Sequence, residues 1–139
     1  MQAKIKWTDG VQFVAESGTG HAVVVDGPPD SGGRNTGPRP MELLLMGLGA
    51  CSSYDVVTIL KKSRQELVDC FTDVQAERVD AIPAVFSKIH LHFLIKGKDL
   101  KAAQVERAVR LSAEKYCSAS IMLGNAGVEI THSHEVIEV

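Results

Sequence analysis

The sequence predicts an α+β fold, and three observations lead to this class. The first third of the 139-residue chain has the alternating pattern of short strands. One long apolar helix pattern follows, and two longer alternating patterns come after it. Strand and helix patterns do not alternate as they do in βαβ units, so a doubly wound parallel sheet is not expected.

The N-terminal segment is expected to form three strands. Residues 4–7 and 11–14 alternate, and Asp9-Gly10 between them is a typical hairpin turn. Residues 21–25 give the third strand pattern, and the glycine- and proline-rich residues 26–40 form a loop. A hairpin layer without a helix of its own is only marginally stable, so we expect it to pack against a second subunit.

A long helix is expected over residues 41–63. Its middle is apolar on all sides, which indicates burial on most faces. Gly47 and Gly49 in that stretch suggest that another backbone approaches closely. Glu42 and Asp55 interrupt the apolar run, which favours a buried helix of a soluble protein over a membrane span.

The remaining elements complete a single domain over residues 1–139. We expect strands over residues 70–79 and 85–95, a helix over 100–116, a short helix starting near Cys117, and a strand over 128–139. Hydrophobic residues make up 45% and charged residues 23%, which is typical of a globular core. The net charge of −2 gives no basic footprint for nucleic acid or a membrane. The N-terminus lacks the apolar core of a signal peptide, so a cytoplasmic location is expected.

Three cysteines are the candidate reactive groups. Cys51, Cys70 and Cys117 are widely spaced and form no zinc-site pattern, so they are expected to be free thiols. Cys51 lies inside an apolar helix, where reactivity requires an activating group from elsewhere in the fold. Cys117 lies at a junction between helices, where free N–H groups favour a thiolate. Composition and spacing alone leave both more often inert than reactive, and Cys70 is expected to be structural.

The histidines are the other candidate ligands. His90 and His92 would share one face of a strand, as would His132 and His134. A four-histidine metal site would need the two strands to pair in register. A solvent-exposed polar face explains these residues more simply, and no metal is expected. Neither a GxSxG elbow nor a phosphate-binding loop is present.

Two segments resemble motifs of a known family. Residues 37–51, GPRPMELLLMGLGAC, resemble the central-helix signature of the OsmC/Ohr family of osmotically inducible and organic hydroperoxide resistance proteins. Residues 114–120, EKYCSAS, resemble its second cysteine motif, and the order of elements agrees along essentially the whole chain. The residues of both motifs are most similar to those of the YhfA-like branch.

The resemblance implies an OsmC-like intertwined homodimer, with antiparallel sheets wrapped around long central helices. Residues 1–36, the N-terminal strands and loop, would then be completed by the partner subunit. It also implies a thiol-dependent peroxidase in oxidative or osmotic stress defence. Cys51 would be the peroxidatic cysteine and form a sulfenic acid, and Cys117 would resolve it to a disulfide. A dihydrolipoyl or similar dithiol would reduce that disulfide, without a metal or bound organic cofactor.

The groups that would activate Cys51 depart from the family pattern. Characterised peroxidases of the family carry a glutamate where this sequence has Met41, and Glu42 follows one residue later, about 100° around a helix. The stretch that resembles the family's arginine-bearing segment offers His21, while Arg34 and Arg39 lie in the loop. Glu42, Arg39 and His21 are therefore the candidate activating residues.

Two other functions remain open from the sequence. The same scaffold could hold a small apolar or thiol-bearing ligand as a binding or carrier protein without peroxide turnover. A dimeric stress protein with a structural role would require Cys51 and Cys117 to lie too far apart to bond.

Overall fold

The computed structural model describes residues 1–139 and confirms the α+β class. The chain divides into two compact units, Met1–Leu44 and Leu45–Val139, and each is described by itself. The expectation of a single domain over residues 1–139 stays a prediction.

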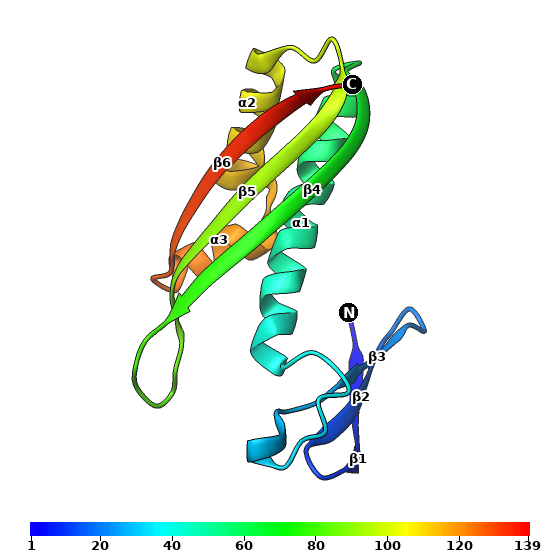
Figure 1. Ribbon diagram of the computed structural model, residues 1–139, viewed down its shortest axis with the longest axis vertical. Helices are drawn as coiled ribbons and strands as arrows, with labels where there is room; N and C mark the ends of the chain where they lie inside the picture. The colour runs from blue at the N-terminus through cyan, green and yellow to red at the C-terminus, as the bar shows by residue number, and fades with distance from the viewer. The chain divides into compact units, whose positions relative to one another are not determined.

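The N-terminal unit contains the three predicted strands. They are β1 (Ala3–Asp9), β2 (Gln12–Ser17) and β3 (Ala22–Val25), paired antiparallel in that order (Figure 1). The Asp9-Gly10 hairpin is confirmed, with Asp9 opposite Gln12 and Gly10 at a φ of 52°. Glycine suits this left-handed position because it has no Cβ.

This unit buries very little. Among its residues, only Val25 and Asp26 are buried, whereas the apolar side chains of Ile5 and Trp7 on β1 are 62% and 61% exposed. A three-stranded sheet with so small a core gains little hydrophobic stabilisation of its own. The exposed side chains leave the unit with an apolar surface that another chain could cover.

Asp26 organises the loop that follows β3. Its carboxylate accepts the Thr36 hydroxyl at 2.6 Å and the backbone N–H groups of Gly27 at 2.8 Å and Arg34 at 3.2 Å. The Thr36 hydroxyl and then these N–H groups hold the pKa of Asp26 at about 2, although burial acts in the opposite direction. The charged Asp26 carboxylate therefore links the start of the loop, at Gly27, to its later part, at Arg34 and Thr36.

Helix α1 (Pro40–Lys62) begins at Pro40, where a missing N–H costs no hydrogen bond. The predicted close approach at Gly49 is made by a side chain, because a Cβ there would lie 2.9 Å from Val74 Cγ2, while Gly47 has nothing within 4 Å. By length and composition this helix could cross a membrane, with 28% of its most apolar window buried. Core helices of soluble proteins meet the same criterion.

The second unit is built on the sheet β4-β5-β6. Strand β4 (Glu66–Arg78) pairs antiparallel with β5 (Phe86–Lys98), and β5 pairs parallel with β6 (Glu129–Glu138). The parallel pair differs from the expected antiparallel sheets. Its cause is the helical crossover between β5 and β6, which returns the chain to the same end of the sheet.

The crossover consists of α2 (Ala102–Leu111), a π-helical turn η2 (Ser112–Tyr116) and α3 (Ser118–Asn125). Figure 1 shows α2 and α3 on one side of the sheet, behind β5 and β6. Alternate residues of β5 face this side and are buried. The core combines these β5 residues with residues of α1 and α2: Ile89, Leu91, Phe93, Ile95, Leu48, Val56, Leu60, Val105 and Ala108.

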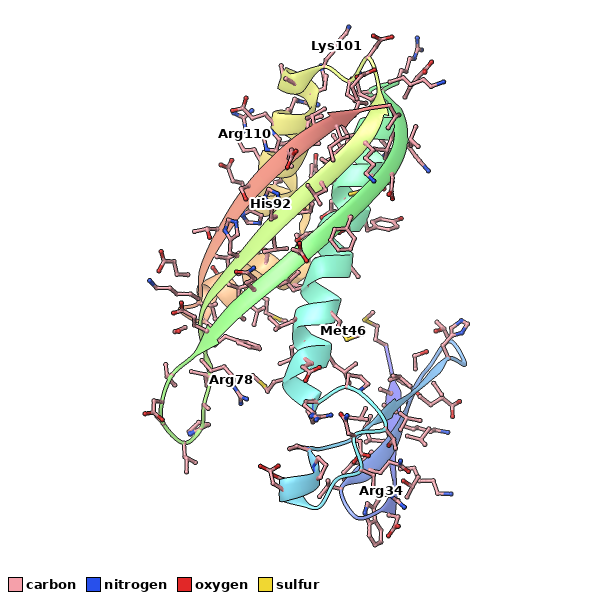
Figure 2. The ribbon with its side chains drawn as sticks, in the orientation of Figure 1. Arg34, Met46, Arg78, His92, Lys101 and Arg110 are labelled. Carbon is pink, nitrogen blue, oxygen red and sulfur yellow. The ribbon has the colours of Figure 1, made fainter.

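The register of β5 and β6 determines whether the four strand histidines can share one metal site. The strands do pair, but Leu91 lies opposite His132 and Phe93 opposite His134. His92 consequently lies on the sheet face that points away from the buried side chains (Figure 2), whereas the His132 ring stacks on Phe93 at 6.4 Å. A four-histidine site on one face is excluded, because the two pairs point to opposite sides.

Candidate functional site

Helix α1 places Cys51 and Asp55 on the same face, one turn apart. Cys117 is the N-cap residue of α3 and is completely buried, while Cys51 and Asp55 are partly exposed. The Cys51 Sγ, the Cys117 Sγ and a carboxylate oxygen of Asp55 lie within 4.8 Å of one another. The fold thus brings a thiol and a carboxyl group of α1 next to the thiol that caps α3.

Cys117 is held by two hydrogen-bond donors. The buried Ser52 hydroxyl donates to Cys117 Sγ at 3.1 Å, and the Ser120 N–H donates at 3.4 Å from the first turn of α3. Burial raises the pKa of the Cys117 thiol, the two donors act against this, and the neighbouring Cys51 raises it further. Cys117 is therefore a buried thiol whose sulfur accepts two hydrogen bonds, an arrangement that suits a thiolate.

Ser112 connects this thiol pair to Asp55. Its hydroxyl lies 3.2 Å from the Ser52 carbonyl oxygen and 3.4 Å from Asp55 Oδ2, and donates to one of them at a time. Burial raises the pKa of Asp55, and the Ser112 hydroxyl opposes that shift. Asp55 is therefore a carboxyl group that is harder to ionise than a solvated one, and it lies next to two sulfur atoms.

The π-helical turn places Ser112 in this arrangement. Residues Ser112–Tyr116 form the turn between α2 and α3, and the Cys117 N–H donates to the Ser112 carbonyl at 2.9 Å. Such bulges occur often at functional sites. The helix predicted over residues 100–116 is thus α-helical to Leu111 and π-helical to Tyr116, and Cys117 becomes the cap of the next helix.

The other predicted site residues lie in the N-terminal unit. Arg39 donates to Asn35 Oδ1 at 2.8 Å and to the Gly37 carbonyl at 3.1 Å. Glu42 is exposed in the first turn of α1, and His21 is exposed directly before β3. Their roles in activating Cys51 stay predictions, because they lie in a different unit from the thiols.

Arg34, also considered as a substitute cation, forms an ion pair with Asp9 at 2.9 Å. Both side chains are largely exposed. The pair holds the guanidinium within the N-terminal unit.

Three residues of the site were missed by sequence reasoning: Asp55, Ser52 and Ser112. Asp55 lies four residues after Cys51, but the sequence marks it only as an interruption of the apolar run. Ser52 follows Cys51 directly and carries no local signal for its bond to Cys117. Ser112 becomes relevant only through the π-helical turn.

The triad of Cys51, Asp55 and Cys117 also has the donor set of a metal site. Two thiolates and a carboxylate are ligands that zinc accepts, and three protein ligands leave a fourth position open. The expectation that the protein needs no metal or bound cofactor stays a prediction.

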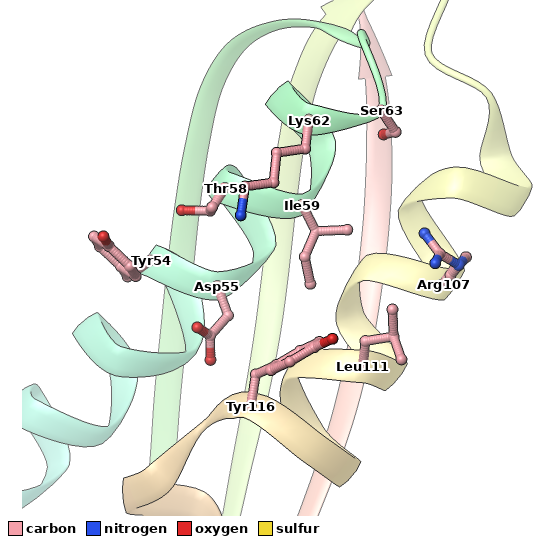
Figure 3. A pocket seen from close by; sticks show the side chains of 9 residues that line it. All are labelled: Tyr54, Asp55, Thr58, Ile59, Lys62, Ser63, Arg107, Leu111 and Tyr116. Carbon is pink, nitrogen blue, oxygen red and sulfur yellow. The ribbon is translucent and has the colours of Figure 1, made fainter.

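A cavity of about 610 Å³ adjoins the triad. Figure 3 shows residues of α1, among them Asp55 and Lys62, on one side, and Arg107 and Leu111 of α2 on the other. The volume falls within the range of small-molecule sites. Asp55 lines the cavity and also lies beside the two sulfur atoms, so the cavity and the thiol site share this residue.

The fold and the adjacent thiols define an α+β protein with a two-cysteine site. Residues 32–133 match the OsmC-like protein family, and the chain belongs to that family. It is 51% identical to Protein YhfA of Escherichia coli (strain K12), over 99% of this chain and 98% of that protein.

Solved structures agree with the assignment. A hypothetical protein from Aquifex aeolicus VF5 is 29% identical with a TM-score of 0.86, covering 99% of this chain and 96% of that one. An organic hydroperoxide resistance protein OsmC from Legionella pneumophila is 20% identical with a TM-score of 0.72, covering 96% and 95%. The second likeness concerns the fold.

Proposed function

We propose that this protein is a thiol-dependent peroxidase for organic hydroperoxides, with Cys51 as the peroxidatic and Cys117 as the resolving cysteine. The observation that carries the proposal is the position of both sulfur atoms within 4.8 Å of each other and of an Asp55 oxygen. Family membership supports it, since relatives of the same fold include organic hydroperoxide resistance proteins.

The exposure of the two thiols supports this order of reaction. Cys51 is partly exposed and reacts with the peroxide. Cys117 is fully buried and reacts afterwards, with the oxidised Cys51. The Cys51 thiolate attacks the terminal peroxide oxygen, so that an S–O bond forms and the O–O bond breaks. The alkoxide takes up a proton and leaves as an alcohol, and Cys51 becomes a sulfenic acid.

The second step closes the disulfide. The Cys117 thiolate attacks the Cys51 sulfur, the S–S bond forms, and the hydroxyl group leaves as water after protonation. The Ser52 and Ser120 donors suit the thiolate that this step needs. An external dithiol, dihydrolipoyl or similar, then gives two electrons and becomes a disulfide itself, so no metal or bound cofactor takes part.

Asp55 is the proton carrier of the first step in this proposal. Burial raises the pKa of its carboxyl group, and one of its oxygen atoms lies within 4.8 Å of both sulfur atoms. The Asp55 carboxylate can take the proton of the Cys51 thiol and pass it to the departing alkoxide. The net reaction consumes one thiol and one hydroperoxide and yields a sulfenic acid and an alcohol.

The proposal includes a cytoplasmic homodimer. Ile5 and Trp7 on β1 and, in the other unit, Met46 on α1 are exposed apolar side chains that a second copy would cover. Three free cysteines suit a reducing compartment. His21, Arg39 and Glu42 would act at the interface of that dimer.

A second candidate is an OsmC-like binding or carrier protein without peroxide turnover. Its supporting observation is that Arg34 and Arg39 are already engaged, by Asp9 and by Asn35, while the cavity beside Asp55 is large enough for a ligand. A purely structural role has less support, because the two sulfur atoms lie close together.

The deciding experiment measures hydroperoxide consumption with dihydrolipoamide and with thioredoxin as alternative reductants. We expect Cys51→Ser to abolish turnover, Cys117→Ser to stop the cycle after one equivalent, and the control Cys70→Ser to retain it. Intact mass after peroxide treatment should fall by two hydrogens. No mass loss, together with ligand retained by Cys51→Ser in native mass spectrometry, would favour the carrier.

A further inference from the structure

We propose that the reduced protein binds one zinc ion through Cys51 Sγ, Cys117 Sγ and a carboxylate oxygen of Asp55, and that this ion closes the thiol site to peroxide. Zinc binding rests on the geometry of the three residues, whereas the block of turnover rests on the proposed function. The ion lies outside the peroxidase cycle, because it occupies the thiolates that the cycle needs.

The three ligand atoms lie close enough together to share one ion. All of them are within 4.8 Å of one another. Zn–S bonds of about 2.3 Å and a Zn–O bond of about 2.1 Å at tetrahedral angles place neighbouring ligand atoms about 3.5–3.8 Å apart. The ligand atoms therefore need to approach one another by about 1 Å. Rotation of the Cys51 and Asp55 side chains can supply this movement, since both are partly exposed.

The ligands come from two helices in an arrangement that suits a metal. Cys51 and Asp55 are four residues apart on α1, so their side chains lie on the same face, one turn apart. Two ligands at this spacing on one helix are a known way of holding zinc. Cys117 completes the set from the N-cap position of α3. All three residues belong to the second unit, so the site is complete within that unit.

Hydrogen bonds from outside the triad hold two of the ligands. The Ser52 hydroxyl donates to Cys117 Sγ at 3.1 Å and the Ser120 N–H donates to it at 3.4 Å. The Ser112 hydroxyl lies 3.4 Å from Asp55 Oδ2. Outer partners of this kind orient metal ligands in proteins. They also favour the deprotonated sulfur and carboxylate that a metal requires.

The donor set selects zinc among the divalent ions. Magnesium and calcium prefer oxygen ligands, so two sulfur ligands disfavour them. Two thiolates and one carboxylate suit tetrahedral zinc, with water in the fourth position. Zinc also neutralises most of the negative charge that these three groups would carry in a partly buried site.

Oxidation of the thiols removes the metal site. Binding replaces the two thiol protons by one Zn²⁺. When a hydroperoxide oxidises the two zinc-bound thiolates, it takes two electrons from sulfur, and the Cys51–Cys117 disulfide forms as the O–O bond breaks. Two protons are taken up, and an alcohol, water and free Zn²⁺ are released. The disulfide has no thiolate, and the Asp55 carboxylate alone does not retain zinc.

The binding test titrates the reduced, full-length protein with zinc in competition with a chromophoric chelator, and native mass spectrometry counts the bound ions. We expect one zinc ion per chain. Cys51→Ser and Asp55→Asn should each weaken binding about a hundredfold, and Ser112→Ala about tenfold, because loss of an outer partner alone costs about tenfold to a hundredfold. Cys70→Ser is the matched control and should bind zinc as the wild type does, since it removes the free thiol outside the triad.

Cobalt(II) in place of zinc shows whether the thiols are ligands. The reduced protein should give the thiolate-to-cobalt charge-transfer band and the strong visible bands of tetrahedral cobalt, and Cys51→Ser should lose the first of these. Circular dichroism checks that each variant is folded. Because Cys51 and Asp55 are partly exposed, their replacement leaves the buried core intact.

Three results would overturn the metal site: no zinc bound by the reduced protein, wild-type affinity in Cys51→Ser or Asp55→Asn, or equal zinc binding after oxidation with diamide. A turnover assay separates this from failure of the proposed function. Saturating zinc should stop hydroperoxide consumption and excess chelator should restore it, whereas unchanged consumption would reject the block. Zinc binding by a protein without any turnover would keep the metal site and reject the peroxidase.

Discussion

Replacing Ser52 by alanine tests the link between the buried hydrogen bond and the resolving thiol. The Ser52 hydroxyl is fully buried and donates to Cys117 Sγ at 3.1 Å. Alanine removes that donor, leaves the backbone carbonyl that faces Ser112, and is the best helix former. The change therefore acts on Cys117 with little cost to the helix.

The expected size follows from the two protonation states of Cys117. A hydrogen bond between neutral groups contributes about 1 kcal/mol, and one to a charged group about 2 kcal/mol. Loss of the donor thus disfavours the thiolate over the thiol by about 1 kcal/mol, a factor of about five. Burial already raises the pKa of Cys117, and Ser52→Ala raises it further. Disulfide closure should slow about fivefold at neutral pH, and its midpoint should move to higher pH.

The assay follows a single turnover. Reduced protein is mixed with one equivalent of cumene hydroperoxide, quenched in acid at intervals, and weighed by intact mass spectrometry to separate sulfenic acid from disulfide. Ser53→Ala is the control, since the Ser53 hydroxyl donates to the Gly49 carbonyl at 2.7 Å and not to a thiol. Unchanged closure in Ser52→Ala, or the same slowing in Ser53→Ala, would refute the reasoning.

Two further predictions concern the N-terminal loop and the accessibility of the thiols. The pKa of Asp26 in the folded protein, about 2, is lower than in the unfolded chain; its stabilisation is therefore complete above about pH 4 and is lost as the pH falls through 2. Asp26→Asn should lower the thermal midpoint at pH 7, and the difference from wild type should shrink on acidification; a constant difference would contradict this. Iodoacetamide should label Cys51 well before Cys117 in the native protein, because Cys117 is 0% exposed and burial raises its pKa, whereas both should react alike in urea. Peptide mass mapping that finds equal native labelling would reject the assigned order of the thiols.

Local patterns were sufficient to predict most elements. The alternation around Asp9-Gly10 gave a confirmed hairpin, and the apolar run after Pro40 gave α1 almost to its last residue. Strand periodicity and turn residues depend on neighbours within a few positions, so a sequence reveals them. The start of β4 at Glu66, earlier than expected, is set by pairing with Lys98 at the far end of β5.

The site was predicted in part. The motifs around Cys51 and Cys117 singled out the two thiols, and the structure brings their sulfur atoms together. Asp55 marks only a break in the apolar run of the sequence, whereas its position beside the two thiols depends on how the helices pack. Ser112 could not be found, because a π-helical turn has no clear local signature.

The sequence by itself determined the class of fold, the family and the two cysteines, because these depend on periodicity and on motif residues within short segments. The tertiary structure alone decided the surroundings of those cysteines. It set the one-residue offset that sends the β5 and β6 histidines to opposite faces, and it joined Ser52, Asp55 and Ser112 to the thiols. Register, burial and hydrogen-bond partners arise between segments far apart in the chain, and the raised pKa values of Asp55 and Cys117 follow from them.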